Sequence, residues 1–449
     1  MKQTVSTRCR APRRPRAQRR IAPRDTSAQE RWGHQMSRIG IAGAGVVGRL
    51  LAWQLARLGH EVHVVDPAPG GWAPFATHDA AQGLSPPPRA NAAAGFSAAG
   101  MLSPLAELEN APQEIATLGW RSLDLWPGIV GALSPEHRAT SLFRRNGSVI
   151  VAHPQDVGAA SRVLARMESQ ARDLANELRG RNDLDAALAR SPMRMPQALA
   201  PEALQTLEPA LARGLHGWYL PGEGQVDAQA LMIALCADAP GVQWNWGIHI
   251  DRVEPRRLRL ADGKALRCDI AIDARGLGAR PVLPLRGVRG EILWLHAPEV
   301  SLRRPVRCVH PRHRVYVVPR RDDHIIVGAT EIDSEDRSSV SVRSAIELLS
   351  AAHSILPELA EARIVRMDTN LRPAMPDQRP TLHVEDGLVR INGLFRHGWL
   401  LAPALVEEAL RQTGLNGENL AQAAPTTVPV SAPMPLQPRV RPRAETNNA

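Results

Sequence analysis

The stretch from Ile39 to Asp66 constrains the fold of this chain more than any other. It starts with a short apolar run, continues through glycines 43, 45 and 48, and ends in a second apolar run closed by Asp66. Glycines at this spacing between a strand and a helix are typical of a βαβ unit that binds a dinucleotide. Gly43 would allow the tight turn, Gly45 the approach of a pyrophosphate, and Gly48 close packing of the helix on the sheet.

The predicted helix has a buried face and a free N-terminus. Apolar residues recur at helical spacing at Val47, Leu50, Leu51, Leu55 and Leu58. Its first N–H groups could bind phosphate, and Asp66 could accept hydrogen bonds from both hydroxyls of a ribose. A glycine-rich turn without a ligand would leave Asp66 unexplained. We therefore predict a dinucleotide site at Gly43, Ala44, Gly45, Val46, Val47, Gly48 and Asp66.

The positive charge of the chain lies in its tails. The net charge is +10, but residues 1–35 alone carry ten basic and two acidic residues, and residues 421–449 carry three and one, so the remainder is neutral. The folded body therefore offers no electrostatic argument for a nucleic-acid partner. We expect residues 1–35 and 416–449 to be disordered.

Three interpretations of residues 1–35 remain open. The segment could be a targeting peptide, because it is rich in arginine and poor in acids, although it has no apolar core of a secretory signal. It could be a nucleic-acid-binding arm. It could also result from an over-long gene prediction, since Met36 stands just before the first strand, and this is the interpretation that we favour.

The composition indicates a protein without membrane spans or metal sites. No run approaches the ~18 uninterrupted apolar residues of a membrane span. The four cysteines, Cys9, Cys236, Cys268 and Cys308, form no C-x-x-C pair and have no histidine at ligand spacing. We expect thiols in a reducing compartment, no metal ligands, and a cytoplasmic protein that could form a homo-oligomer.

Downstream of Asp66 the pattern predicts two interleaved domains. Pro67 to Ala94 shows no hydrophobic period, which predicts a surface loop. Asp227 is placed as the N-cap of a helix. Residues 289–330 alternate like an antiparallel sheet with a hairpin between 315–318 and 325–327. We predict helices over 112–132, 155–180 and 342–355, a helix opening near Gly398, and strands over 147–151, 242–250, 258–260, 270–274, 291–295 and 388–392.

Six further motifs carry a family resemblance. They are Ala98–Leu102 (AAGML), Arg289–Leu293 (RGEIL), Tyr316–Arg320 (YVVPR), Val327–Glu331 (VGATE), Leu371–Pro373 (LRP) and Phe395–Pro403 (FRHGWLLAP). In this order they resemble the glycine oxidases, the thiamine-biosynthesis branch of the FAD-dependent D-amino-acid-oxidase-like family. The resemblance covers about residues 38–412.

The resemblance implies FAD as the cofactor and an α/β fold. The fold would be a discontinuous Rossmann-like FAD-binding domain (36–105, 221–285 and 371–415) with an inserted α+β substrate domain on an antiparallel sheet (106–220 and 286–370). FAD would be held by the dinucleotide site above and by Ala99, Gly100, Met101, Leu394, Phe395, Arg396, His397, Gly398, Trp399 and Leu400.

The resemblance also implies the reaction. Arg372 and Tyr316 would grip the carboxylate of a small amine or amino acid, and Arg396 would lie beside the flavin. Hydride would pass to flavin N5, the imine would hydrolyse, and O2 would reoxidise the flavin to give H2O2, with no obligatory catalytic base. An arginine and a tyrosine suit this task because together they offer three hydrogen bonds to a carboxylate. A solvated arginine in a turn is the alternative for Arg372.

Some positions depart from the family pattern. Ala274-Arg275-Gly276 stands where most of the family has Ala-Thr-Gly, so a hydroxyl near the cofactor is missing. Arg314 and Glu331 flank the expected pocket and could favour a substrate other than glycine. Three other functions stay open: a D-amino-acid dehydrogenase that reduces a quinone or other carrier, an RNA-associated flavoprotein of tRNA modification, and a silent FAD-binding scaffold.

Overall fold

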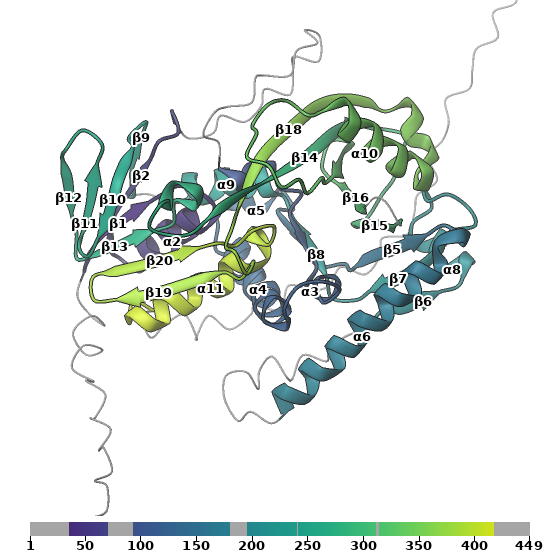
Figure 1. Ribbon diagram of the computed structural model, residues 1–449, viewed down its shortest axis with the longest axis horizontal. Helices are drawn as coiled ribbons and strands as arrows, with labels where there is room; N and C mark the ends of the chain where they lie inside the picture. Colours follow the sequence, from purple (N-terminus) through teal and green to yellow (C-terminus); the bar gives the residue numbers. More distant parts are fainter. Residues whose placement is uncertain (1–35, 71–92, 180–194, 240, 311–313, 417–449) are drawn as a thin grey trace, which may run out of the picture.

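The computed structural model describes residues 36–70, 93–179, 195–239, 241–310 and 314–416 (Figure 1). The predictions for residues 1–35 and 417–449, and for most of the loop from 67 to 94, lie outside these ranges. The fold is α/β, as predicted, with one parallel sheet, one large antiparallel sheet and two small three-stranded sheets. The division into domains at the predicted boundaries stays a prediction.

The first large sheet has six strands in the order β19-β20-β13-β1-β2-β9. All of them run parallel except β19, which pairs antiparallel with β20. The predicted βαβ unit is confirmed, because helix α2 connects the neighbouring strands β1 and β2. The elements are β1 (Arg38–Ala42), α2 (Val46–Arg57), β2 (Glu61–Asp66), β9 (Gln243–Trp246), β13 (Ile270–Asp273), β19 (Thr381–Glu385) and β20 (Leu388–Asn392).

The main core lies between this sheet and its helices. The apolar residues of β1 and of α2 are buried, including Ile39, Ile41 and the predicted helix face from Val47 to Leu55. Three helices join the same core: α4 (Gln113–Gly131), α9 (Ala228–Ala237) and α11 (Gly398–Thr413). Asp227 caps α9 by accepting a hydrogen bond from Ala230 N–H at 3.0 Å, as the sequence predicted.

The second large sheet has eight strands in the order β18-β14-β17-β16-β15-β5-β7-β6. Its pairings are antiparallel except between β15 and β5. In Figure 1 it lies beside the parallel sheet, and α10 (Val342–Ile355) covers its outer face. The strands are β5 (Ser148–Ala152), β6 (Gln197–Leu199), β7 (His216–Leu220), β14 (Arg286–His296), β15 (Val306–Val309), β16 (Arg314–Pro319), β17 (His324–Gly328) and β18 (Arg363–Ala374).

Strand alternation gives this sheet two different faces. Val315 and Val317 of β16 belong to the core beneath α10, whereas Tyr316 and Val318 point to the opposite face. That opposite face packs against Ala99 and carries the side chains expected for the substrate pocket. The period of two therefore places Tyr316 toward the other sheet.

The described residues also form two small sheets and several short helices. The short sheets are β3 (Met101–Leu102), β8 (Gly224–Val226) and β4 (Phe143–Arg144), and β10 (Ile250–Glu254), β11 (Arg257–Leu260) and β12 (Ala265–Arg267). The remaining helices are η1 (Ala94–Ser97), α3 (Pro104–Glu107), α5 (Pro135–Arg138), η2 (Pro154–Asp156), α6 (Val157–Arg179), α8 (Pro201–Leu207), η3 (Gly276–Ala279) and η4 (Pro357–Glu361). Across the described ranges, no helix combines the length and apolarity that a membrane crossing requires.

One local prediction was wrong. The single strand expected over 242–250 is two strands, β9 and β10, because Gly247 adopts a left-handed turn conformation (φ 72°) between them. The chain around Arg372 is the end of β18, a strand of 12 residues that pairs with β14 along its length. The alternative interpretation of Arg372, a solvated arginine in a turn, is therefore excluded.

Candidate active site

A cavity of about 1010 Å³ runs between the two large sheets. At one end it follows the carboxyl ends of the parallel strands, where ligands bind in sheets of this kind. At the other end it reaches Tyr316 and Arg372. All predicted site residues line it except Ala44 and Gly48, which lie behind the glycine loop.

The three motif glycines have different local roles. A Cβ on Gly48 would sit 1.9 Å from the carbonyl oxygen of Gly43, and a Cβ on Gly43, which has φ 99°, would sit 2.6 Å from the carbonyl oxygen of Ala274. These two glycines are required by the packing of the chain itself. A Cβ on Gly45 would meet only Ala93 Cβ at 3.9 Å. The space beside Gly45 opens into the cavity and fits a ligand that approaches the backbone.

The carboxylate of Asp66 is fixed at the rim of the cavity by two backbone N–H groups. Ala44 N–H donates to Oδ2 at 2.6 Å, and Ala68 N–H donates to Oδ1 at 2.8 Å. A carboxylate can accept about four hydrogen bonds. Asp66 therefore keeps acceptor capacity for the hydroxyls of a ribose, and this role stays a prediction.

The side chain of Arg275, which departs from the family pattern, is engaged within the protein. Its guanidinium forms a two-point ion pair with Asp273, with Nε to Oδ1 at 2.9 Å and Nη2 to Oδ2 at 2.8 Å, and both side chains are nearly inaccessible. Nη1 donates to the carbonyl of Ile250 at 3.1 Å. The side chain ties β13 to β10, at the point where Ile250 lines the cavity.

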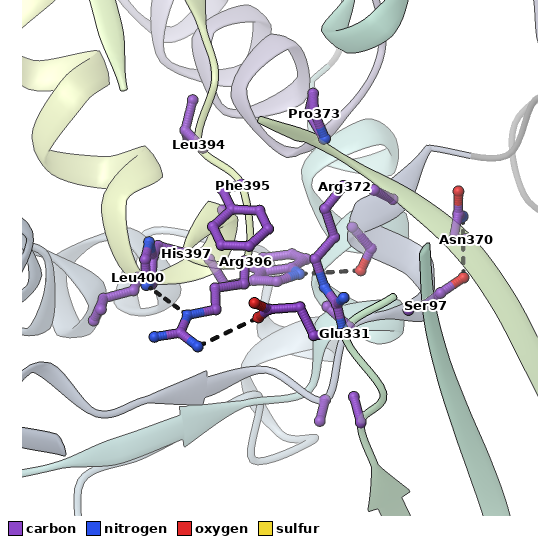
Figure 2. Close-up of a pocket in the computed structure, with 18 of the residues that line it drawn as sticks. Ser97, Glu331, Asn370, Arg372, Pro373, Leu394, Phe395, Arg396, His397 and Leu400 are labelled. Atoms are coloured by element: carbon purple, nitrogen blue, oxygen red, sulfur yellow. Dashed lines mark hydrogen bonds and ion pairs between the residues drawn. The ribbon is translucent and has the colours of Figure 1, made fainter. Parts of the chain in front are cut away.

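The loop from Leu394 to Leu400 closes one wall of the cavity (Figure 2). Phe395 N–H donates to the carbonyl of Pro373 at 2.9 Å, and the indole of Trp399 donates to the carbonyl of Gly95 at 3.0 Å. Helix α11 starts at Gly398, where a Cβ would meet only Val46 Cγ1 at 3.7 Å. The positive end of this helix therefore faces the cavity and favours negative charge there.

The guanidinium of Arg372 lies at the other end of the cavity. Nη1 donates to the carbonyls of Thr330 at 3.0 Å and of Arg289 at 3.3 Å. Within the described residues no carboxylate forms an ion pair with it, and burial lowers the pKa of this guanidinium from its ordinary value. A partly buried cation held only by carbonyls among the described residues is suited to bind an incoming carboxylate.

Tyr316 stands close to Arg372 on the same side of the sheet. Burial raises the pKa of its hydroxyl, and the nearby charges of Arg372, Arg307, Arg320 and Arg396 lower it in part. Because its pKa is raised, the hydroxyl stays neutral. It makes no hydrogen bond to any described residue, so it can donate one to a ligand.

A charged cluster around Glu107 occupies the same end. Glu107 Oε2 lies 2.8 Å from Arg396 Nη2 and 3.0 Å from His397 Nε2, and Oε1 lies 3.5 Å from Arg307 Nη2. Burial raises the pKa of Glu107, but the charges of His397 and Arg396 outweigh it and hold that pKa well below the usual range. Glu107 is therefore ionised.

Arg396 is paired, unlike Arg372. Besides Glu107 it contacts Glu331 Oε2 through Nη1 at 3.4 Å (Figure 2). Burial lowers its pKa, but Glu107 and Glu331 raise it above the ordinary value. Glu331, which the sequence placed beside the pocket, thus balances Arg396, while the side chain of Arg314 lies outside what the structure describes.

Several residues of the cavity were not predicted from the sequence. Glu107 lies on the short helix α3, and Asn370 lies two residues before Arg372 and donates from Nδ2 to Ser97 Oγ at 3.1 Å (Figure 2). Arg307 pairs directly with Tyr316 across β15 and β16. The alternation of β16 could have indicated the face of Tyr316, but not which strand would become its neighbour.

The geometry fits an extended dinucleotide-type cofactor with a small anionic substrate at one end. The open backbone beside Gly45 and Gly398 fits a ligand that runs along the cavity. The ring nitrogen Nδ1 of His397 is buried and has no partner among the described residues, which also fits a polar ligand group at this wall.

Known proteins share this architecture. The model of the FAD-dependent oxidoreductase family called DAO matches residues 38–409. The putative thiamine biosynthesis oxidoreductase ThiO of Rhizobium etli is 34% identical over 381 residues, which cover 84% of this chain and 96% of that protein. The glycine oxidase of Geobacillus kaustophilus is 26% identical and is covered to 89%, with 81% of this chain.

The crystal structure of the glycine oxidase from Bacillus cereus has the same fold. It superposes with a TM-score of 0.66 at 22% identity and covers 85% of this chain and 98% of its own. With the family model spanning nearly the whole described body and the cavity fitting the cofactor, the chain belongs to the DAO family of FAD-dependent oxidoreductases.

Proposed function

We propose that this protein oxidises glycine or a closely related small amine that carries a carboxylate. The observation that carries the proposal is the partly buried guanidinium of Arg372, held by two carbonyls beside the hydroxyl of Tyr316. The names of the relatives from Rhizobium etli and Geobacillus kaustophilus support the same substrate class and a role in thiamine biosynthesis. O2 is the proposed electron acceptor, with H2O2 as product.

The residues of the cavity would hold FAD along its length. The glycine loop and Asp66 would hold the adenine dinucleotide end, and Ala99 to Met101 with Leu394 to Leu400 would hold the flavin end. FAD, when bound, supplies the two-electron oxidation of the amine. The chain itself supplies position and charge.

At the substrate end, the side chains would divide the work. Arg372 binds the carboxylate through two hydrogen bonds and Tyr316 adds a third, which fixes the α-carbon relative to the cofactor. Arg396 lies beside this position, with its charge balanced by Glu107 and Glu331. The start of α11 favours negative charge at the wall of the cavity.

The ion pairs at this end of the cavity support a substrate that carries a carboxylate. Arg396 pairs with Glu107 and Glu331, whereas Arg372 has no carboxylate partner among the described residues. A substrate with a carboxylate therefore fits better than one without an acidic group.

The test is a peroxide assay on purified protein with glycine, sarcosine and a set of D-amino acids. We expect a flavin spectrum, turnover of glycine or sarcosine, and one H2O2 for each amine oxidised. Turnover only with an artificial quinone acceptor would overturn the oxidase proposal in favour of a dehydrogenase, and flavin content without turnover on any amine would indicate a silent scaffold. Deleting residues 1–35 should leave activity unchanged and reveal no specific RNA binding.

A further inference from the structure

Behind the glycine loop lies an arginine that the sequence patterns did not single out. Arg49 belongs to the first turns of α2, on the buried side of the helix, and its side chain is only 2% exposed. It does not line the cavity. Arginine is rarely buried to this extent without a carboxylate partner.

Arg49 is held by carbonyl oxygens and aromatic rings. Nε donates to the carbonyl of Ala44 at 2.8 Å, and Nη1 donates to the carbonyl of Met232 at 2.7 Å. Its guanidinium carbon lies over three aromatic rings at 5.2, 5.8 and 5.3 Å from their centroids, those of Phe96, Trp244 and Trp246. The described residues provide no ion pair to this guanidinium.

The positive charge is costly where it stands. Burial lowers the pKa of the Arg49 guanidinium from its ordinary value, and the negative charge of Asp66 raises it in part. Carbonyls and aromatic faces offset part of the cost of desolvating the guanidinium. Asp66 does not touch Arg49, because its oxygens accept from Ala44 and Ala68. Asp66 therefore offsets the charge of Arg49 only in part and without contact, and a bound anion can balance the remainder.

Arg49 and Asp66 act on the two sides of one loop residue. Asp66 accepts from the N–H of Ala44, and Arg49 donates to its carbonyl, so Ala44 is fixed between the two charges. The neighbouring residues Gly45 and Val46 form the wall of the cavity at the start of α2. The FAD-dependent family brings a diphosphate to this loop, and a diphosphate carries the negative charge that is missing.

We propose that Arg49 is a positioning residue for the diphosphate of the cofactor: it fixes the glycine loop through Ala44 and places a buried positive charge, only partly balanced by Asp66, behind that loop. Arg49 makes no contact with the reacting end of the cavity, whose residues are Tyr316, Arg372 and Arg396. The proposal therefore assigns it to cofactor affinity and not to turnover.

The experiment compares Arg49→Met with Arg49→Lys on the apoprotein. Methionine keeps the length of the side chain but removes the charge, whereas lysine keeps the charge and can donate to one carbonyl. Binding of FAD, of ADP and of adenosine would be titrated, because ADP carries the diphosphate and adenosine does not. We expect Arg49→Met to raise Kd for FAD and for ADP at least 10-fold, Arg49→Lys to stay within about 3-fold of the natural protein, and Kd for adenosine to change by less than 3-fold in both.

Turnover and a matched control separate positioning from a structural role. The kcat of Arg49→Met saturated with FAD should equal that of the natural protein within 2-fold. Arg57 is an exposed arginine at the end of the same helix with a ring contact to Trp53, and Arg57→Met should leave all three Kd values unchanged. Should Arg49→Met fail to fold, Arg49→Gln carries the same comparison, because its amide still donates to a carbonyl.

Three results would overturn the proposal. If Arg49→Lys and Arg49→Met weakened the binding of FAD and ADP equally, the shape of the side chain and not its charge would matter. Natural affinity of Arg49→Met for ADP would remove the link to the diphosphate. An equal loss of adenosine binding would assign Arg49 to the general packing of the domain.

Discussion

The guanidinium of Arg372 lies against the α-carbon of Gly290 on the neighbouring strand, so closely that a Cβ at position 290 would sit 2.4 Å from its carbon Cζ. Gly290 therefore makes the space in which Arg372 reaches the carbonyls of Arg289 and Thr330. The position of the proposed carboxylate anchor depends on a residue that has no side chain.

Gly290→Ala should displace this guanidinium from its place. We expect KM for the amine to rise by roughly 10-fold or more, which corresponds to about 1.4 kcal/mol or more, because the hydrogen bonds to the substrate carboxylate lose their geometry. Steady-state kinetics with glycine or sarcosine measures the effect. Gly128→Ala is the matched control, because a Cβ there meets nothing within 4 Å, and it should leave KM unchanged.

Replacing Arg372 itself should have a larger effect on binding. Arg372→Ala removes the charge-assisted bonds to the carboxylate, and we expect kcat/KM to fall roughly 10- to 200-fold, or about 1.5 to 3 kcal/mol. Arg372→Lys should recover part of the loss, since it restores the charge but not the two parallel bonds. A value of kcat/KM like that of the natural protein in Arg372→Ala would exclude the carboxylate assignment.

The sequence predicted the parts of this fold that depend on local periodicity. The glycine spacing and two apolar runs indicated β1, α2 and β2, and the helix over 342–355 matches α10 residue for residue. The hairpin of β16 and β17 followed from alternation with a polar turn. In each case the residue pattern that predicts the element lies within about 30 consecutive residues.

What the sequence did not predict depends on contacts between distant segments. Polar and apolar residues alternate along the strand β18, but the burial is inverted there: Arg366, on the polar face, is buried, whereas Met367, on the other face, is exposed. Glu107 meets Arg396 across 289 positions, and nothing in its local sequence indicates an ion pair. Arg49 stands within an otherwise apolar helix face, and its cage forms only when β9 and η1 pack around α2.

The ion pairs of Glu107 should make stability depend on pH. The pKa of Glu107 is lower in the folded protein than in the unfolded chain, so the unfolded chain binds more protons over the interval between the two values. The contribution of Glu107 to the free energy of unfolding is complete above the pKa of the unfolded chain, about 4.3, and is lost as the pH falls through the pKa in the folded protein. Glu107→Gln lacks this contribution, so the difference in Tm between the natural protein and the variant should shrink below about pH 4.3.

A series of thermal unfolding measurements from pH 7 down to pH 3 tests this expectation. Glu385, which is largely exposed and pairs with Arg390 on the surface, provides a control. The difference in Tm for Glu385→Gln should be small at every pH. A difference for Glu107→Gln that stays constant across the series would contradict the assignment of a depressed pKa to this carboxylate.

Gly45→Ala should separate cofactor binding from folding. Gly45 has extended backbone angles (φ −73°, ψ −172°) that alanine adopts freely, and the new Cβ would touch only Ala93 Cβ at 3.9 Å. The apoprotein should therefore keep its Tm within about 2 °C. The methyl group would occupy the space in which the cofactor approaches the backbone, so we expect Kd for FAD to rise at least about 10-fold. Gly48→Ala should do the reverse and lower the Tm of the apoprotein first, because its Cβ would collide with the carbonyl of Gly43. Full FAD affinity in Gly45→Ala would show that the glycine loop does not lie against the cofactor.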